Sequence, residues 1–599
     1  DDGEVIELWA ERPDKPFDRD TELTLTDVEL TENGLTTLAE ALQLVPEINV
    51  RNAGRGGNVI DIRGARRGSN KVLVDGVAVS DPWYGTFDVS SVPVTDIVQI
   101  RVAPSPSSPI DGPGGTGGVI EIHTRDAIGP RRLDTRILGS SAPEGNVSGT
   151  GRAMLGARWA VRPSVSVDLG SYDFPMESAS VDEDRRETHG GLRVEYRRGK
   201  RRLVVDLAGQ QRSYIVPPSE NLSGDIRDID GETTARAAVT ADDQLGAWRL
   251  QGRVFAFRMT RSSVSYGGYE RYQDDAPSFI EDLSATHLGA SFLANRPLRK
   301  RFRLITSATV LSGSADVANQ RGLSGDNPRT TEEGGRSTIS EVAAGLQWED
   351  GPLRIDSAAG LAVPIGVGDG PWPEFKLSAW YRAMPGITFK AIGARKGRIP
   401  TLRELYRSDT GNQDLDPEFV WFGELAVELR PSRWVELSSS AYMRDATGLI
   451  KLQLGDDGMN QLVNLDDLLI RGLDHTLLIA PREVISLGGS WSYVNPAPMR
   501  NGDEPFDFMP RHRARLWLSA RPVERAQITA RVSYVGQRFD GGTALPGVTL
   551  VELVAHSTIG RGLSANLRID NLADTRWNIR NNVFGPGRTA ILSLYGQWQ

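Results

Sequence analysis

The sequence contains no cysteine among its 599 residues. Disulfide frameworks, cysteine-ligated zinc sites and thiol nucleophiles are therefore excluded. Long apolar runs are also missing, because no stretch approaches the roughly 20 apolar residues that a membrane helix requires. The chain opens at Asp1 without the basic, apolar leader of a secretory signal. We therefore expect the sequence to be that of a processed, mature chain.

Basic residues and histidines are not clustered. The net charge is −9, and lysines and arginines are scattered along the chain. A nucleic-acid-binding surface needs a basic patch or stripe, so no nucleic-acid partner is expected. The histidines lack the spacing of a metal site and are interpreted as individual surface or lumen residues. They are His123, His189, His287, His475, His512 and His556.

Catalytic motifs are missing as well. The glycine-rich stretch 112–118, GPGGTGG, superficially resembles a phosphate-binding loop, but it lacks the Lys-Ser/Thr ending and leads into a strand. Glycine there fits tight backbone turns better. No serine lies in a nucleophile-elbow motif. The sequence therefore predicts neither an enzyme nor a cofactor.

What the chain does contain is a compact region of mixed structure over residues 59–124. Four runs rich in Val and Ile, VIDIRG, KVLVDGVAV, IVQIRV and GGVIEIHT, are separated by turns of Gly, Pro, Asn and Asp. Such runs predict a small sheet. Before them, residues 25–44 predict one short helix, which Thr36, Thr37 and Glu40 cap and Pro46 ends.

The remainder of the chain, from Leu133 to Trp598, repeats segments of about ten residues with alternating apolar and polar positions. VSVDLG, LRVEYRR and ITARVSYVG are clear examples. This is the pattern of a transmembrane β-barrel, and about 22 segments are counted, including ones expected to begin at Thr188 and Thr338. Tight connections, such as 198–201, alternate with longer ones, such as 396–418, which places both ends of the barrel on the periplasmic side.

Several of these motifs resemble one family. LAEALQLVPEINV, VIDIRGARRGSNKVLVDGVAV, IVQIRV and GTGGVIEIHT, in this order, resemble the plug domain of TonB-dependent outer-membrane receptors. In the barrel, GRIPTLRELY (397–406), GNQDLDPE (411–418) and IDNLADTRW (569–577) resemble signatures of the same family. The two sets of motifs cover both ends of the chain.

The resemblance implies a membrane β-barrel of about 22 antiparallel transmembrane strands with an N-terminal α+β plug domain inside the lumen. It divides the chain into a periplasmic tail with a TonB-box-like segment (1–20), the plug (21–128) and the transmembrane barrel (129–599). One departure stands out, because the family's usual acid and arginine in the plug are replaced by Arg101 and Pro104. The charge pattern that holds the plug to the wall is therefore expected to differ.

The N-terminal tail, residues 1–20, is acidic and contains proline apart from an extended apolar run. Its composition fits an ordinary disordered terminus, and it also fits a peptide that adds a strand to a partner's sheet. The resemblance implies the second role, with TonB as the partner. The predicted TonB-binding residues are Glu4, Val5, Ile6, Glu7, Leu8, Trp9 and Ala10.

Candidate ligand-binding residues lie in two plug turns and one outer loop. The turns 52–58 and 80–87 offer a cation and three aromatics, which can fix a ligand in an apolar pocket or pack the plug against the wall. The tyrosines of loop 265–275 are spaced to stack on a flat ligand or to form an interfacial belt. The predicted residues are Arg55, Trp83, Tyr84, Phe87, Tyr266, Tyr269 and Tyr272.

A second loop clusters Asp225, Asp228, Asp230 and Glu232. Closely spaced oxygen ligands before a glycine turn suit calcium, but the spacing misses the EF-hand pattern. A solvated acidic loop is the preferred interpretation, and calcium binding stays as the weaker alternative.

The resemblance implies a monomer in the bacterial outer membrane, in contact with lipid and lipopolysaccharide. It would import a scarce nutrient chelate, of ferric siderophore or cobalamin type, into the periplasm. TonB, with ExbB and ExbD, would supply the work that moves the plug. The alternative is a receptor-like protein that does not transport and acts in surface signalling or secretion, as Arg101, Pro104 and the unusual Trp9 suggest. A passive porin is disfavoured because the plug would block its lumen.

Overall fold

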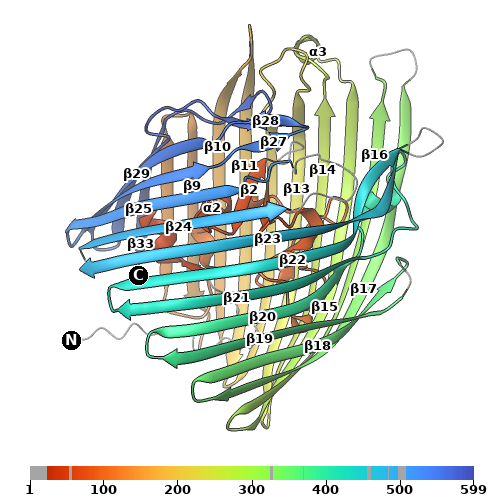
Figure 1. Ribbon diagram of the computed structural model, residues 1–599. Helices are drawn as coiled ribbons and strands as arrows, with labels where there is room; N and C mark the ends of the chain where they lie inside the picture. Colours follow the sequence, from red (N-terminus) through yellow and green to blue (C-terminus); the bar gives the residue numbers. More distant parts are fainter. Residues whose placement is uncertain are drawn as a thin grey trace.

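The computed structural model describes residues 23–52, 57–323, 328–368, 370–454, 460–482, 484–496 and 507–598. Within these residues, 22 antiparallel strands form a closed barrel in which each strand pairs with its neighbours (Figure 1). The helices in the same residues are all too short or too polar to span a membrane. The predicted fold class, a barrel of about 22 strands around an N-terminal plug, is confirmed.

The barrel strands differ widely in length. They are β8 (Arg132–Ser140), β9 (Glu144–Met154), β10 (Trp159–Pro175), β11 (Ser180–Arg198), β12 (Arg201–Val216), β13 (Arg227–Leu245), β14 (Trp248–Ser265), β15 (Phe279–Arg299), β16 (Phe302–Arg321), β17 (Arg329–Asp350), β18 (Leu353–Ile365), β19 (Trp372–Met384), β20 (Ile387–Arg398), β21 (Glu418–Ser432), β22 (Val435–Leu454), β23 (Asn460–Arg482), β24 (Ile485–Pro496), β25 (His512–Val523), β26 (Ala526–Val535), β29 (Val548–Gly560), β30 (Leu563–Asp570) and β33 (Thr589–Trp598).

Two strands begin eight or nine residues earlier than the sequence predicts, which are the largest differences among the strand starts. β11 begins at Ser180 and not at Thr188, and β17 begins at Arg329 and not at Thr338. Both extensions are rich in charged residues, so they lack the apolar alternation that marks a strand facing lipid. They are still strands because each pairs with a long neighbour along its whole extension.

Tight and long connections alternate around the barrel. Turns such as 199–200 and 561–562 join strands at one end, which we call the inner end, and both β8 and β33 start or finish there. Long connections such as 399–417 and 571–588 lie at the opposite, outer end. They carry two short helices and two small hairpins, namely α3 (Tyr269–Gln273), α4 (Leu402–Tyr406), β27 (Arg538–Asp540) with β28 (Thr543–Leu545), and β31 (Asn578–Arg580) with β32 (Val583–Phe584).

Side chains alternate between the two faces of the wall. On β19, Phe375 and Leu377 are exposed on the outside, whereas Glu374 and Lys376 are buried in the lumen. An apolar outer band with a polar interior is the arrangement of a transmembrane barrel.

The plug fills the lumen, where Figure 1 shows its red and orange segments inside the ring of strands. Its five-stranded mixed sheet has the order β1-β6-β7-β4-β5, and a separate hairpin joins β2 to β3. The strands are β1 (Leu23–Thr26), β2 (Ile48–Asn52), β3 (Asn58–Ile62), β4 (Asn70–Val74), β5 (Val77–Ala78), β6 (Ile97–Ala103) and β7 (Gly118–Thr124). Short 3-10 turns connect them: η3 (Arg67–Ser69), η4 (Val89–Ser91), η5 (Val94–Asp96) and η6 (Pro109–Asp111).

The plug has two short helices where the sequence predicts one. They are α1 (Asp27–Glu32) and α2 (Leu38–Gln43), and each begins with a capping box, from Thr26 and Glu29 and from Thr37 and Glu40. The chain breaks between them at Gly34, whose φ of 62° ends the first helix. Thr37 and Glu40, two of the three residues assigned to the predicted cap, do form one.

The apolar core of the plug continues into the barrel wall. Leu38, Leu42 and Ile100 are fully buried at its centre, and wall residues such as Phe257 and Leu283 join the same cluster. The plug is therefore seated against one part of the wall by direct apolar packing.

Candidate functional site

The plug loop 80–87 lies directly beneath α4 of the barrel. The first backbone amides of α4 donate to the loop, from Leu402 N to the Pro82 carbonyl and from Arg403 N to the Trp83 carbonyl, both at 3.1 Å. Thr401 caps the helix, and a Cβ placed at Gly85 would lie only 2.6 Å from its Cγ2. The loop and the helix therefore touch closely, and glycine is needed for that contact.

A cavity of about 320 Å³, which we call the outer cavity, opens above this contact. It combines an aromatic floor from the plug with charged side chains from the wall, from loop 266–278 and from the chain around α4. The lining residues are Trp83, Arg227, Ser278, Phe279, Glu281, Asn319, Arg321, Glu333, Arg403 and Arg407. Four arginines face two glutamates, so the lining carries a net positive charge.

The arginines of the outer cavity are accessible to solvent. The side chain of Arg321 is 40% exposed and that of Arg407 is 24% exposed, and both pair with Asp409, at 3.0 and 2.5 Å. Arg227 pairs with Asp225 at 3.2 Å. A guanidinium offers a planar fork of donors that suits carboxylate, phosphate or other oxyanion groups. The lining therefore offers donors of the type that recognise oxyanions, three of which already pair with Asp225 or Asp409.

The predicted plug residues divide into different roles. Trp83 is buried, with 1% of its surface exposed, and forms the floor of the outer cavity. The Tyr84 hydroxyl donates to Glu281 at 2.7 Å, and its ring lies 5.1 Å from the Arg261 guanidinium. Phe87 packs against the plug core. Arg55 lies outside the described residues.

A buried acid shapes the turn that carries these aromatics. Asp81 accepts hydrogen bonds from Trp83 N at 2.8 Å and from Tyr84 N at 3.3 Å. Burial raises the pKa of Asp81 to about 6, against the opposing attraction of Arg261. The turn therefore contains a carboxyl group whose charge changes near neutral pH.

The three loop tyrosines pack on one another and on neighbouring loops. The rings of Tyr266 and Tyr272 meet edge to face at 5.2 Å, and the Tyr266 hydroxyl donates to Asp275 at 3.1 Å. Tyr269 and Tyr272 pack against a small cluster around Ile226 at the outer rim. None of the three is among the residues that line the outer cavity.

The four acids considered for calcium are not gathered into one site. Asp225 pairs with Arg227, and Glu232 accepts from Arg212 at 2.6 Å inside the lumen. Across the part of the chain that the structure describes, no three His, Cys, Asp or Glu side chains come close enough to hold a metal ion. The predicted TonB-binding residues, 4–10, lie outside the described residues.

Buried ion pairs hold the plug against the wall, and little in the sequence indicates them. Arg63, at the end of VIDIRG, is buried and pairs with Glu424 at 2.6 Å and Asp474 at 2.9 Å. The only local signal is a lone cation that ends an apolar strand. Its partners are 361 and 411 residues away in the chain, so no local pattern identifies them.

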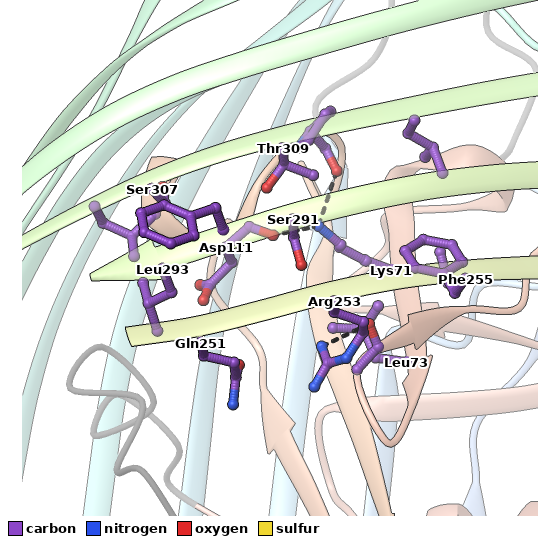
Figure 2. Close-up of a pocket in the computed structure, with 16 residues that line it drawn as sticks. Lys71, Leu73, Asp111, Gln251, Arg253, Phe255, Ser291, Leu293, Ser307 and Thr309 are labelled. Carbon is purple, nitrogen blue, oxygen red and sulfur yellow. Dashed lines mark hydrogen bonds between the residues drawn. The ribbon is translucent and has the colours of Figure 1, made fainter. Parts of the chain in front are cut away.

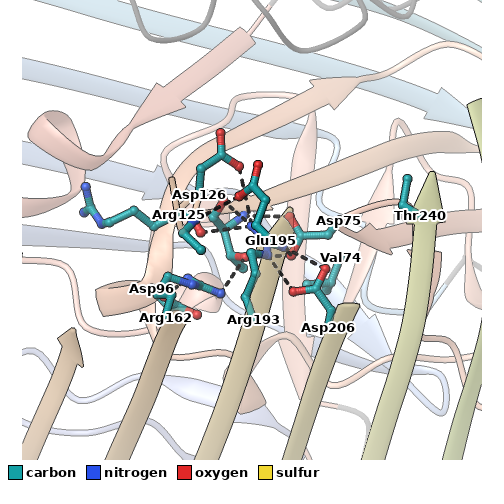
Figure 3. A network of polar contacts seen from close by, with 12 residues as sticks. Val74, Asp75, Asp96, Arg125, Asp126, Arg162, Arg193, Glu195, Asp206 and Thr240 are labelled. Carbon is teal, nitrogen blue, oxygen red and sulfur yellow. Dashed lines mark hydrogen bonds and ion pairs between the residues drawn. The ribbon is translucent and has the colours of Figure 1, made fainter. Parts of the chain in front are cut away.

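A second set of ion pairs joins the plug to β10–β12 (Figure 3). Arg193 of β11 pairs with plug Asp75 at 2.8 Å and with Asp206 of β12 at 2.6 Å. Arg162 of β10 pairs with plug Asp96. The pairs with Asp75 and Asp96 are buried and would be broken if the plug moved away on this side, at the cost of separating opposite charges in a buried region.

The plug's N-terminal helices are held by strands near the end of the chain. Glu40 of α2 pairs with Arg568 of β30 at 2.7 Å. Burial alone would raise the pKa of Glu40, but the attraction of Arg568 outweighs it and lowers the pKa to about 2. The carboxylate therefore remains charged over the whole physiological range.

The plug segment 101–117, which begins with the altered residues Arg101 and Pro104, is held to the wall in a different way. The Arg101 guanidinium lies 3.9 Å from the Glu121 carboxylate of the neighbouring plug strand. Barrel cations donate instead to backbone carbonyls of this segment, from Arg444 to Thr116 and Gly117 at 2.7 Å each and from Lys376 to Pro106 at 2.9 Å. Similar contacts are made by Lys396, whose Nζ is 3.1 Å from the Gly112 carbonyl. The wall therefore supplies the charge that the segment itself lacks.

Comparison with known proteins gives two family matches. Residues 20–119 match the TonB-dependent receptor plug domain, and residues 171–572 match the TonB-dependent receptor-like β-barrel. The second match alone covers more than half of the chain. The proteins of this family are transport receptors and not enzymes.

Individual relatives are distant but extend over nearly the whole chain. The ferric enterobactin receptor PirA of Pseudomonas aeruginosa is 24% identical over 657 aligned positions, which cover 92% of this chain and 86% of PirA. The vitamin B12 transporter BtuB of Photobacterium profundum is 21% identical, and the alignment covers 90% of this chain and 86% of BtuB. The solved structure of the ferric enterobactin receptor PfeA from Pseudomonas aeruginosa superposes with a TM-score of 0.81 at 16% identity. The superposition covers 96% of this chain and 98% of the PfeA chain.

Proposed function

Because this chain belongs to the family of TonB-dependent receptors, we propose that it is an outer-membrane transporter that imports an anionic metal chelate into the periplasm. The observation that carries the proposal is the outer cavity, where Arg227, Arg321, Arg403 and Arg407 surround the plug residue Trp83. Guanidinium groups and an aromatic floor suit a chelate with negatively charged, planar metal-binding groups. This favours a ferric siderophore over an uncharged corrinoid.

The proposal includes a source of energy. The outer membrane has no ATP, so work must arrive through a partner, and we propose that TonB, with ExbB and ExbD, pairs with residues 4–10 as an added strand. The described plug begins at Leu23, in an edge strand of its sheet, so a pull on the preceding residues reaches the plug sheet directly. We further propose that the protein acts as a monomer in contact with lipid and lipopolysaccharide.

Charge variants of the outer cavity test the proposed ligand class. Arg321→Gln and Arg403→Gln are each expected to weaken binding of ferric enterobactin, used as an anionic probe, by about 10-fold or more, because a charge-assisted hydrogen bond contributes roughly 1.5–3 kcal/mol. Binding of uncharged cyanocobalamin serves as the comparison. Arg576→Gln is the matched control, since this exposed arginine pairs with Glu220 outside the cavity.

Equal affinity for ferric enterobactin in all three variants, or preferential binding of cyanocobalamin, would contradict an anionic ligand.

Deletion of residues 5–10 tests the energy source, and it should abolish uptake while surface binding of the chelate persists. Continued uptake without this segment rules out the TonB-driven model. Binding without uptake by the intact protein, in cells with a working TonB system, would instead support the non-transporting receptor.

A further inference from the structure

A second cavity lies between the plug and the wall, closer to the inner end of the barrel (Figure 2). We call it the inner cavity, and its volume is about 70 Å³. Lys71 and Asp111 of the plug line one side, and Arg253, Ser291 and Thr309 of the wall line the other. It is a gap of a few water molecules between two surfaces that elsewhere are closely packed.

Two cations that line the inner cavity donate hydrogen bonds to backbone carbonyls of the plug. Lys71 Nζ donates to the carbonyls of Asp111 at 2.8 Å and Pro113 at 3.0 Å. Arg253 Nη1 donates to the carbonyl of Gly76 at 3.1 Å. A passing oxyanion can replace a backbone carbonyl at either cation, and the hydrogen bond then joins two opposite charges.

The two cavities lie on the same strands. On β15, Glu281 lines the outer cavity and Ser291 lines the inner one, and at about 3.4 Å per residue they are roughly 34 Å apart along the strand. On β16, Arg321 lines the outer cavity and Thr309 the inner one. The two cavities therefore lie toward opposite ends of the same part of the wall, which we call the β14–β16 sector.

Between its two ends this sector meets the plug mainly through apolar side chains. The wall residues in the plug's core cluster include Met259, Leu283, Ala285, Ala315 and Val317, from β14 to β16. Their contacts can slide or separate without leaving a buried charge unpaired.

Other sectors hold the plug through buried ion pairs. Arg162 and Arg193 bind plug carboxylates from β10 and β11, and Arg568 binds Glu40 from β30. On the opposite wall, Glu424 and Asp474 bind Arg63. These buried ion pairs therefore lie outside β14–β16, where hydrogen bonds such as Tyr84 to Glu281 and Arg253 to the Gly76 carbonyl hold the plug instead.

From these contacts we propose that the imported anion passes along the β14–β16 sector, from the outer to the inner cavity, and that Lys71 and Arg253 bind it on the way. The loop 80–87 moves aside from β16, while the ion-paired sides of the plug stay docked. This inference rests on the proposed function and adds to it a route and a second binding site.

Paired disulfides test the route, because the natural chain has no cysteine to interfere. Pro82→Cys with Gly313→Cys joins the loop to β16, where a Cβ at Gly313 lies 2.9 Å from the Pro82 Cβ. Gly34→Cys with Asn566→Cys joins the plug to β30 on the far side, where the corresponding distance is 3.6 Å. The distance at β30 lies within the roughly 3.5–4.5 Å of natural disulfides, whereas the one at β16 is shorter, so the loop must move outward by about 0.6 Å or more to accept the bond.

Uptake and binding of radiolabelled ferric enterobactin are measured in cells before and after reduction. The disulfide at β16 should reduce uptake at least 10-fold, reversibly, with binding changed less than twofold, whereas the disulfide at β30 should leave uptake intact. Loss of uptake with both disulfides, or with neither, overturns the route. If the reduced proteins bind the chelate but import none, or bind none, the proposed function fails and the route fails with it.

Charge variants test the second binding site separately. Lys71→Gln and Arg253→Gln should each slow uptake about fivefold or more at unchanged surface affinity, and Arg253→Lys should restore part of the rate because it keeps the charge. Lys390→Gln is the matched control, since this buried lysine lies on β20, outside the sector. Equal uptake rates in all four variants would overturn the role of the two cations.

Discussion

At the scale of single residues, the plug contains two acids with opposite environments. Glu40 is paired with Arg568, which lowers its pKa, whereas the pKa of Asp81 is raised mainly by burial. The Glu40 carboxylate binds the plug to the barrel. Asp81 accepts hydrogen bonds within the turn that carries Trp83, and its buried surroundings favour the neutral form of the side chain.

Asp81→Asn should therefore remove a pH dependence of the plug. The folded pKa is about 6 and the ordinary value is 3.8, so the folded state binds more protons between these values. Stability is then greatest below pH 4 and falls as the pH rises to 6, by up to about 3 kcal/mol, since each unit corresponds to about 1.4 kcal/mol. Asparagine keeps an acceptor for the amides of Trp83 and Tyr84 and carries no charge.

Hydrogen exchange at the amides of Trp83 and Tyr84, corrected for intrinsic rates, measures this effect. Protection in the asparagine variant should exceed that of the natural protein at pH 7 and match it near pH 4. Lower protection in the variant at pH 7 would show that the charged carboxylate stabilises the turn.

At the scale of elements, the alternation of apolar and polar positions was sufficient to predict the barrel and its connections. Each strand faces lipid on one side and the lumen on the other, so its sequence carries a local signal. The outer cavity has no such signal. Arg227, Arg321 and Arg403 come from β13, β16 and α4, and only the long-range register of the strands brings them together.

Packing of distant segments also separates the predicted site residues into two groups. Trp83 was predicted from its aromatic turn and does line the outer cavity, whereas Tyr266 is directed into contacts among the loops. Both lie in glycine-containing turns of similar composition. Composition identifies residues that suit a ligand, but the packing of distant segments decides which of them face one.

The contact between α4 and the plug should be sensitive to a single methyl group. In Gly85→Ala the new Cβ would lie 2.6 Å from Thr401 Cγ2, and the residue's φ of 67° adds strain. Overpacking of this kind typically costs about 1–3 kcal/mol. We expect α4 to be displaced, with increased proteolysis of the connection 399–417 and weaker binding at the outer cavity.

Thr401→Ser, made in the Gly85→Ala background, should restore much of the protection because it removes Cγ2 and keeps the capping hydroxyl. Gly114→Ala is the control for backbone strain, with a φ of 80° and no atom within 4 Å of the new Cβ. If Gly114→Ala were equally harmful, or Thr401→Ser gave no rescue, the close contact would not be the cause.

At the scale of the whole molecule, the barrel closes without help from the plug. Every pairing around the ring joins strands within residues 132–598, and the last pair is between β33 and β8. A polar, water-filled lumen is a stable state of large barrels. The buried partners of the plug, such as Glu424 and Arg193, would then be solvated.

A chain that lacks the plug, residues 23–124, is therefore expected to form an open channel. Its conductance in a planar bilayer should be large and only weakly selective, and the full-length protein should show little conductance under the same conditions. Comparable conductance for both chains would show that the plug does not seal the lumen. A heat-modifiable band in electrophoresis would confirm that the shortened chain has folded.

The pairing of the plug's first segments with the barrel's last strands sets an order of assembly. Arg513, Arg531 and Arg568 bind residues 33–48 of the plug from β25, β26 and β30. These strands are synthesised long after residues 33–48, so the polar groups of that plug segment acquire their partners only after most barrel strands have been made. Insertion of these strands and seating of the plug are thus one coupled event.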